Sequence, residues 1–135
     1  MSVRVPTPDV SLTDLVVTLK KETTKEEINE AMRVASETTM KGILGYSELP
    51  LVSSDYKGCP LSSIVDGLST MMVGPKMAKV VAWYDNEWGY SNRLVELALL
   101  LLKKASKIKG ACLHGKETVR DINVKGKKGP RPRGL

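Results

Sequence analysis

Alternating apolar and polar residues near the N-terminus predict a β-strand over residues 10–19. A period of two is typical of a strand, because successive side chains point to opposite faces of a sheet. The alternation changes phase once, which predicts a bulge or bend near Asp14. The apolar positions are Val10 and Leu12 in one phase, then Leu15, Val17 and Leu19 in the other.

A helix is predicted to begin directly after Thr24. Thr24 and Glu27 have the spacing of a capping box, in which the two residues bond each other's backbone N–H groups. Apolar residues then recur at helical spacing, so we expect this stripe to face a sheet. The stripe consists of Ile28, Ala31, Met32 and Ala35.

Short apolar segments separated by glycine predict four further strands, followed by a long helix. The strands are placed at residues 43–44, 62–66, 70–73 and 77–84, and the helix at about 88–105. Both faces of the last strand are largely apolar, so we expect a helix layer on one face and another subunit on the other. The predicted class is α+β: a mixed or antiparallel sheet with helices packed on one face, ending in a long C-terminal helix.

The charge is divided unevenly along the chain. Residues 107–135 hold nine Lys or Arg against two acids, giving +7, whereas residues 1–106 hold twelve against thirteen, giving −1. We therefore expect a folded body at 1–106 without a basic surface, and a basic, disordered tail at 107–135. No apolar run approaches the roughly 20 residues of a membrane span, so no membrane partner is expected.

The two cysteines do not point to a metal site or to a disulfide framework. Cys59 and Cys112 lack the spacing of metal ligands, and two cysteines alone define no set of bridges. No secretory leader precedes them, so a reduced, cytoplasmic protein is expected. The sequence also has no glycine-rich phosphate-binding fingerprint between a strand and a helix.

Four of the six aromatic residues fall within residues 83–91, where the last strand gives way to the long helix. Turns of this kind carry polar side chains into ligand sites. Asn86 has the donors and acceptor that pair with a carboxamide, and the ring of Tyr90 suits a flat heterocycle. Alternatively, Asp85 or Asn86 only caps the helix, and the aromatic rings fill the core.

Residues 83–91 resemble the signature near the C-terminus of phosphorylating glyceraldehyde-3-phosphate dehydrogenases. Three further blocks resemble the same family and occur in the family's order. They lie at residues 2–11, 41–46 and 51–56. The chain is therefore identified as the C-terminal part of that family's catalytic domain, covering about residues 1–106.

The resemblance implies roles for three residues in the oxidation of glyceraldehyde 3-phosphate to 1,3-bisphosphoglycerate, in glycolysis or carbon fixation. Asn86 would hold the nicotinamide carboxamide of NAD or NADP, and Tyr90 would line the same pocket. Arg4 would bind the phosphate of the substrate and the attacking inorganic phosphate. Without the Val-Pro-Thr-Pro that follows it, Arg4 would be interpreted as part of a surface ion pair. Members of the family are homotetramers.

The sequence departs from the family where the catalytic nucleophile is concerned. The family's cysteine lies in a Ser-Cys-Thr-Thr-Asn context, which neither Cys59 nor Cys112 shares. His114, the only histidine, lies in the basic tail and is interpreted as exposed chain. We therefore assign no catalytic residue, and we expect the chain alone to be inactive and to bind no cofactor tightly.

The tail resembles a second family over Lys116–Lys128, the start of phosphoglycerate kinase. In that family the next residues are Val-Leu-Val-Arg-Val-Asp-Phe, whereas here residues 129–135 are Gly-Pro-Arg-Pro-Arg-Gly-Leu. These residues can be written in codons that encode Val-Leu-Val-Arg-Val-Asp when they are read one base out of frame. The tail is thus interpreted as a reading frame that runs into a neighbouring kinase gene and ends in an out-of-frame scar.

Two other functions are compatible with the sequence. The tail residues 125–133 are basic enough to contact nucleic-acid phosphates, but no aromatic residues lie among them to stack on bases, so a nucleic-acid partner is not expected. In the second alternative, the chain is a non-catalytic assembly partner that joins full-length subunits through its sheet.

Overall fold

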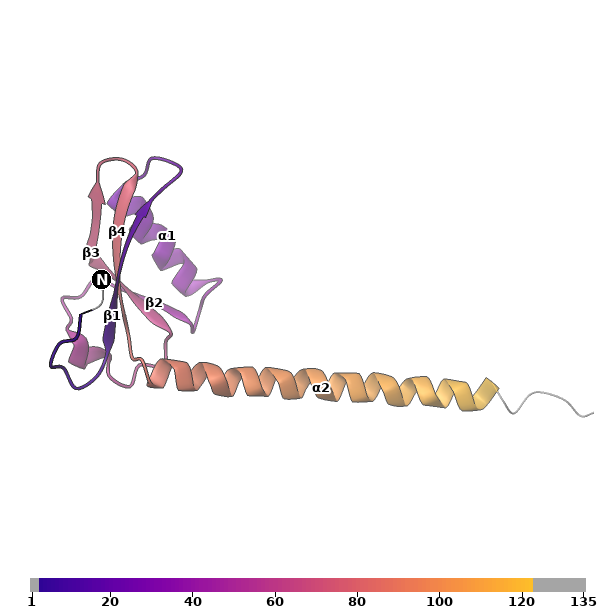
Figure 1. Ribbon diagram of the computed structural model, residues 1–135. Coiled ribbons are helices and arrows are strands. Elements are labelled where there is room, and N and C mark those ends of the chain that lie inside the picture. Colours follow the sequence, from indigo (N-terminus) through magenta and orange to yellow (C-terminus); the bar gives the residue numbers. More distant parts are fainter. Residues whose placement is uncertain (1–2, 123–135) are drawn as a thin grey trace, which may run out of the picture. The chain divides into compact units, whose positions relative to one another are not determined.

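The computed structural model describes the backbone of residues 3–122 and the side chains of residues 3–106. The chain divides into two compact units, Met1–Val95 and Glu96–Leu135. The elements are β1 (Ser11–Thr18), α1 (Lys25–Glu37), β2 (Leu44–Ser47), the short 3₁₀ helix η1 (Ser53–Tyr56), β3 (Ser63–Val73), β4 (Met77–Tyr84) and α2 (Trp88–Ile122). The predicted α+β class, mixed sheet and long C-terminal helix are confirmed (Figure 1).

The four strands form one sheet in the order β1-β4-β3-β2. β1 and β3 both pair with β4 in antiparallel fashion, and β2 runs parallel to β3. The predicted bulge near Asp14 is wrong, because β1 pairs with β4 in one unbroken register from Ser11 to Thr18. The backbone distortion lies instead at Val10, where φ is 73°, a conformation rare for a β-branched residue.

The structure also differs from the prediction in the extent of strand β3. Residues 62–66 and 70–73 were expected to be two strands divided by Gly67, but β3 runs through Gly67 as a single strand. The pairing with β4 shifts register between Asp66 and Met71. The irregular pairing thus covers residues 67–70, and the strand continues through it. Beside it, β2 covers Leu44–Ser47 and so extends beyond the predicted residues 43–44.

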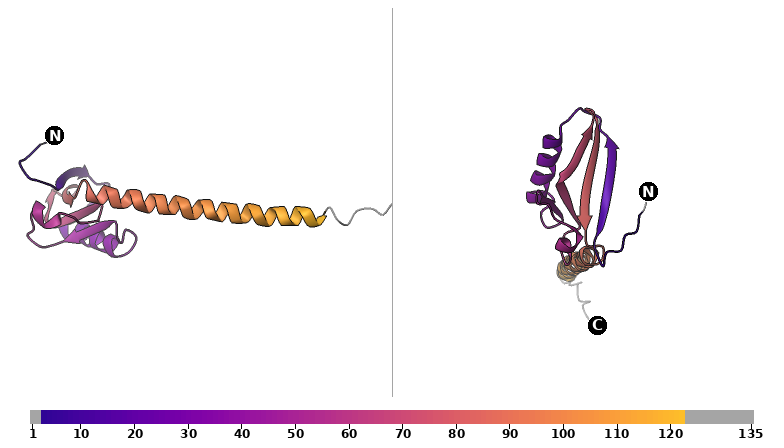
Figure 2. Two further views of the ribbon diagram at one scale, coloured as in Figure 1. Left: turned by 90° about the horizontal axis from the view of Figure 1, so that it is seen from below. Right: turned by 90° about the vertical axis from the view of Figure 1, so that its left-hand side faces the viewer.

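Helix α1 begins at the predicted capping box and lies on one face of the sheet (Figure 2). The hydroxyl of Thr24 accepts a hydrogen bond from the backbone N–H of Glu27, and the Glu27 carboxylate accepts one from the N–H of Thr24. The predicted apolar stripe is partly wrong. Ala31 is exposed, and Asn29 is buried instead, with its amide donating to the Gly67 carbonyl at 2.9 Å.

Helix α2 begins at Trp88, as predicted, but continues well beyond the predicted end at residue 105. Residues 107–122, which were expected to be disordered, have a helical backbone. Seven of these sixteen residues are Lys, Ala, Leu, Glu or Arg, which have high helix propensity, but the helix also passes through two glycines. The remaining tail residues, 123–135, lie outside the described part of the chain.

One buried hydrophobic cluster brings together the residue before β1, the helix η1 and strand β3. It comprises Val10, Tyr56 and Ile64, each less than a tenth exposed, with Trp83 packed against them. The rings of Tyr56 and Trp83 stack with centroids 5.7 Å apart. Burial raises the pKa of the Tyr56 phenol. Within residues 3–122, no helix is long and apolar enough to cross a membrane.

Candidate functional site

The turn between β4 and α2 is organised by Asp85, which is only 3% exposed. One carboxylate oxygen, Oδ1, accepts hydrogen bonds from the backbone N–H groups of Glu87 at 3.1 Å and Trp88 at 2.8 Å. These groups have no partner inside the helix, so Asp85 acts as the N-cap of α2. Of the two caps considered from the sequence, Asp85 or Asn86, the structure selects Asp85.

The second oxygen of Asp85 reaches a distant loop. Oδ2 accepts a hydrogen bond at 2.8 Å from the backbone N–H of Gly58, 27 residues earlier in the chain. Gly58 has φ +76°, which favours glycine. The bonds from Trp88 and Gly58 hold the pKa of Asp85 below its ordinary value, because they stabilise the ionised carboxylate. A buried, charged carboxylate thus ties the start of α2 to the loop after η1.

A third restraint on this turn is the close approach of Gly89 to residue 61. A Cβ atom placed on Gly89 would lie 2.8 Å from the backbone carbonyl oxygen of Leu61. Because the obstructing atom belongs to the backbone, a larger residue at position 89 would push the first turn of α2 away. Gly89 is buried, and its N–H donates to the Asp85 carbonyl at 3.1 Å.

Asn86 and Tyr90 both present their side chains to solvent at this turn. Asn86 is exposed, and its Oδ1 accepts a long hydrogen bond of 3.4 Å from the hydroxyl of Ser11 at the start of β1. Tyr90 is 68% exposed and follows Asn86 by four residues in the first turn of α2. The structure thus places the two predicted cofactor-binding residues close together in the chain, one in the turn capped by Asp85 and one in the first turn of α2.

Arg4 lies apart from the turn in the chain, in the extended segment before β1. Its side chain is exposed. The segment leads into β1, whose first residue, Ser11, pairs with Tyr84 and bonds Asn86. Ser11, seven residues after Arg4, is thus the point at which this end of the chain meets the Asn86 turn.

The aromatic residues of the junction divide between core and surface. Trp83 stacks on Tyr56, as the structural interpretation of the junction predicts. Trp88 is 52% exposed and Tyr90 is 68% exposed, so neither ring fills the core. The turn therefore combines a structural cap with an exposed polar and aromatic surface.

The cysteines contribute little to this site. Cys59 is partly buried and packs against the cluster around Tyr56. The backbone of residue 112 is helical, but its side chain and that of His114 lie outside the described part of the chain. Among the described side chains, no three His, Cys, Asp or Glu residues gather in a way that suits a metal ion.

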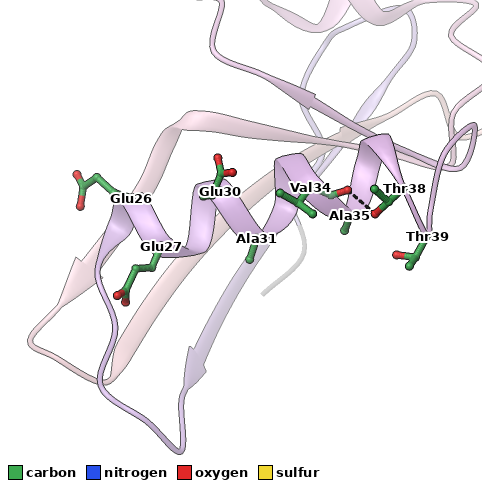
Figure 3. Close-up of a pocket in the computed structure, with 8 residues that line it drawn as sticks. All are labelled: Glu26, Glu27, Glu30, Ala31, Val34, Ala35, Thr38 and Thr39. Carbon is green, nitrogen blue, oxygen red and sulfur yellow. Dashed lines mark hydrogen bonds between the residues drawn. The ribbon is translucent and has the colours of Figure 1, made fainter.

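Two hollows flank α1, away from the candidate residues. The larger, about 780 Å³, lies on its outer face, where the side chain of Val34 and several carboxylates point outward (Figure 3). Its lining residues are Glu26, Glu27, Glu30, Ala31, Val34, Ala35, Thr38 and Thr39. The smaller, about 440 Å³, includes Tyr46, whose pKa is raised to about 12 by burial and by its hydrogen bond to Glu48. Neither is lined by Arg4, Asn86 or Tyr90.

Comparison with known proteins identifies the family. Residues 1–86 match the family described as glyceraldehyde 3-phosphate dehydrogenase, C-terminal domain. The chain belongs to the glyceraldehyde-3-phosphate dehydrogenase family. The resemblance drawn from the four sequence blocks is thereby confirmed, and the matched range ends at Asn86. The comparison gives no support to the kinase resemblance of residues 116–128.

Curated members of the family are closely similar to this chain. Glyceraldehyde-3-phosphate dehydrogenase 1 of Bacillus cereus is 60% identical over 103 residues, which are 76% of this chain and 31% of that protein. The Geobacillus stearothermophilus dehydrogenase is 58% identical over 104 residues, 77% of this chain and 31% of the relative. The chain thus spans about a third of the length of the curated relatives it matches.

Sequence reasoning missed two residues that shape the turn, Gly58 and Gly89. Their importance depends on contacts with Asp85 and Leu61, which are distant in the sequence. One sequence signal was available. Aspartate is a favoured N-cap residue, so Asp85, close to the predicted start of the helix, was already a candidate cap, but its partner Gly58 carries no such signal.

Proposed function

We propose that this chain is the C-terminal catalytic part of a phosphorylating glyceraldehyde-3-phosphate dehydrogenase that uses NAD or NADP. The observation that carries the proposal is the exposed Asn86 amide on a turn held by the buried carboxylate of Asp85, in a chain of this family. The rival nucleic-acid-binding role has only the basic tail in its favour. The family match and the exposed Asn86 turn favour the enzyme.

The donor set at the turn fits the nicotinamide end of the cofactor. A carboxamide needs both a donor and an acceptor, and the Asn86 amide provides both. The exposed ring of Tyr90, on the same turn, provides a flat surface beside the heterocycle. The Ser11 hydroxyl donates to Asn86 Oδ1, which leaves both N–H groups of the amide available to a ligand. When bound, the nicotinamide supplies the hydride acceptor of the oxidation.

In this proposal Arg4 contributes electrostatic recognition of phosphate. Its guanidinium is planar and permanently charged, so it can bind two phosphate oxygens at once. Its exposed position before β1 leaves it accessible to substrate and to inorganic phosphate. The homotetrameric assembly of the family and its cytoplasmic setting in glycolysis or carbon fixation are part of the same proposal.

A full-length chimera tests the function. Residues 1–106 of this chain replace the matching third of the Geobacillus stearothermophilus relative, and oxidation of glyceraldehyde 3-phosphate is followed by NADH absorbance. Asn86→Ala is expected to lower kcat/KM by roughly 10- to 100-fold, because a small misplacement of a reacting group has an effect of that size.

The matched control is Asn92→Ala. The Asn92 amide donates within α2, to the Trp88 carbonyl at 2.8 Å, and the control is expected to keep near-normal kinetics. An active chimera in which Asn86→Ala has no effect on kcat/KM contradicts the assigned role of Asn86.

We also propose that the tail from residue 116 derives from a neighbouring phosphoglycerate kinase gene. The proposal is supported by the resemblance of Lys116–Lys128 and by the out-of-frame match that follows it. Resequencing the DNA is expected to reveal a kinase reading frame one base out of register beyond the Lys128 codon. If no such frame exists, the tail belongs to this protein, and its basic residues become candidates for binding nucleic acid.

A further inference from the structure

The carboxylate of Asp85 bonds three backbone N–H groups on two separate segments, and Asn86 lies between them. Oδ1 holds Glu87 and Trp88, while Oδ2 holds Gly58. Asn86 is thus held on both sides, because the side chain of Asp85 before it bonds the N–H of Glu87 after it. Its own side chain accepts the long hydrogen bond from the Ser11 hydroxyl.

A helix cap alone does not require the bond to Gly58. Serine, threonine or asparagine would cap α2 with a single oxygen. A buried carboxylate is costly unless its oxygens are bonded, and here the second oxygen is used to reach a loop 27 residues away. That loop follows η1, whose Tyr56 stacks on Trp83 in the core. The bond therefore ties the Asn86 turn to the loop that follows the buried Tyr56.

We propose that Asp85 is a positioning residue for Asn86: its bond to Gly58 fixes the turn so that the Asn86 amide meets the nicotinamide carboxamide. This inference rests on the proposed function, because it concerns the same site. Asp85 does not touch the cofactor. It acts through the placement of its neighbour, and the effect of losing it must therefore disappear when Asn86 is already absent.

The substitution Asp85→Asn removes the bond to Gly58 and keeps the helix cap, so it tests the two roles of the carboxylate separately. Asparagine keeps one oxygen and is as good an N-cap as aspartate, but its amide nitrogen cannot accept the N–H of Gly58. In the 135-residue chain, hydrogen exchange measured by NMR is expected to rise by about tenfold or more at the Gly58 amide, as loss of a charge-assisted bond implies. Exchange at the Trp88 amide is expected to stay nearly unchanged.

The chimera supplies the functional readout through a double-mutant cycle. Asp85→Asn is expected to raise the dissociation constant for NAD, measured by calorimetry, by roughly tenfold or more, as loss of one hydrogen bond to a charged group implies. The double variant Asp85→Asn/Asn86→Ala is expected to bind NAD as Asn86→Ala does alone, because the two residues act as one unit. The control is Asp55→Asn, which removes a similar carboxylate bond, to the Val52 N–H at 2.8 Å, in η1.

The outcomes separate this inference from the proposed function. If Asn86→Ala leaves NAD binding unchanged, the proposed function fails at Asn86. If Asn86→Ala weakens binding while Asp85→Asn has no effect, or adds its full effect in the double variant, the positioning role of Asp85 is wrong. The inference is supported only when the Gly58 amide loses protection and the two substitutions are non-additive.

Discussion

The 135-residue chain alone will not oxidise glyceraldehyde 3-phosphate, even with NAD and inorganic phosphate at saturating concentrations. The reaction class needs a thiolate that attacks the aldehyde. Cys59, the cysteine with a described side chain, is partly buried against the core, and its neighbours do not resemble the family's nucleophile context. Without a covalent intermediate, the rate enhancement of many orders of magnitude that enzymes supply is lost.

The measurement is NADH formation by the purified chain, compared with the chimera at equal concentration. The chimera serves as the positive control, because it restores the nucleophile on the same C-terminal third. Activity that copurifies with the 135-residue chain through successive columns contradicts the prediction. Testing Cys59→Ala and Cys112→Ala in that event identifies whether either thiol is responsible.

Ile64→Ala is expected to be the most destabilising simple truncation among the core residues of the sheet. Ile64 is 5% exposed and belongs to the cluster with Val10 and Tyr56. Removing a buried isoleucine side chain costs about 2–5 kcal/mol, through lost burial and the cavity left behind. Because domains of this size are stabilised by only about 5–15 kcal/mol, the loss is a large fraction of the total.

Urea denaturation followed by tryptophan fluorescence measures the loss as a lower transition midpoint. The matched control is Leu68→Ala on the same strand, whose side chain is 50% exposed and therefore loses little burial. Equal shifts for the two variants would show that the cluster around Ile64 does not dominate the stability of the first unit.

The sequence by itself determined the elements whose signals are local. The capping box at Thr24 and Glu27 specified the start of α1, because both partners lie within one helical turn. The run of β-branched and small apolar residues between glycine and the acidic turn specified β4 at Met77–Tyr84. The start of α2 and the family membership of the body were likewise available from short, ordered sequence blocks.

Only the tertiary structure decided the features that depend on contacts between distant residues. β1 is an edge strand with much of its apolar surface exposed, so its change of phase did not require a bulge near Asp14. Asn29 replaced Ala31 on the buried face of α1 because the carbonyl of Gly67 was there to accept its amide proton. The spacing of apolar residues within a helix does not reveal such a hydrogen-bond partner, because the partner lies on a strand distant in the sequence.

The candidate site divides in the same way. Residue type and spacing were enough to select Asn86 and Tyr90 as neighbours on one turn. They were not enough to reveal that Asp85 bridges to Gly58, because a hydrogen bond across 27 residues forms only once η1 and the sheet have packed. The sequence thus proposed Asn86 and Tyr90 as candidate side chains, and the folded backbone decided that both are exposed and that Asp85 holds the turn in place.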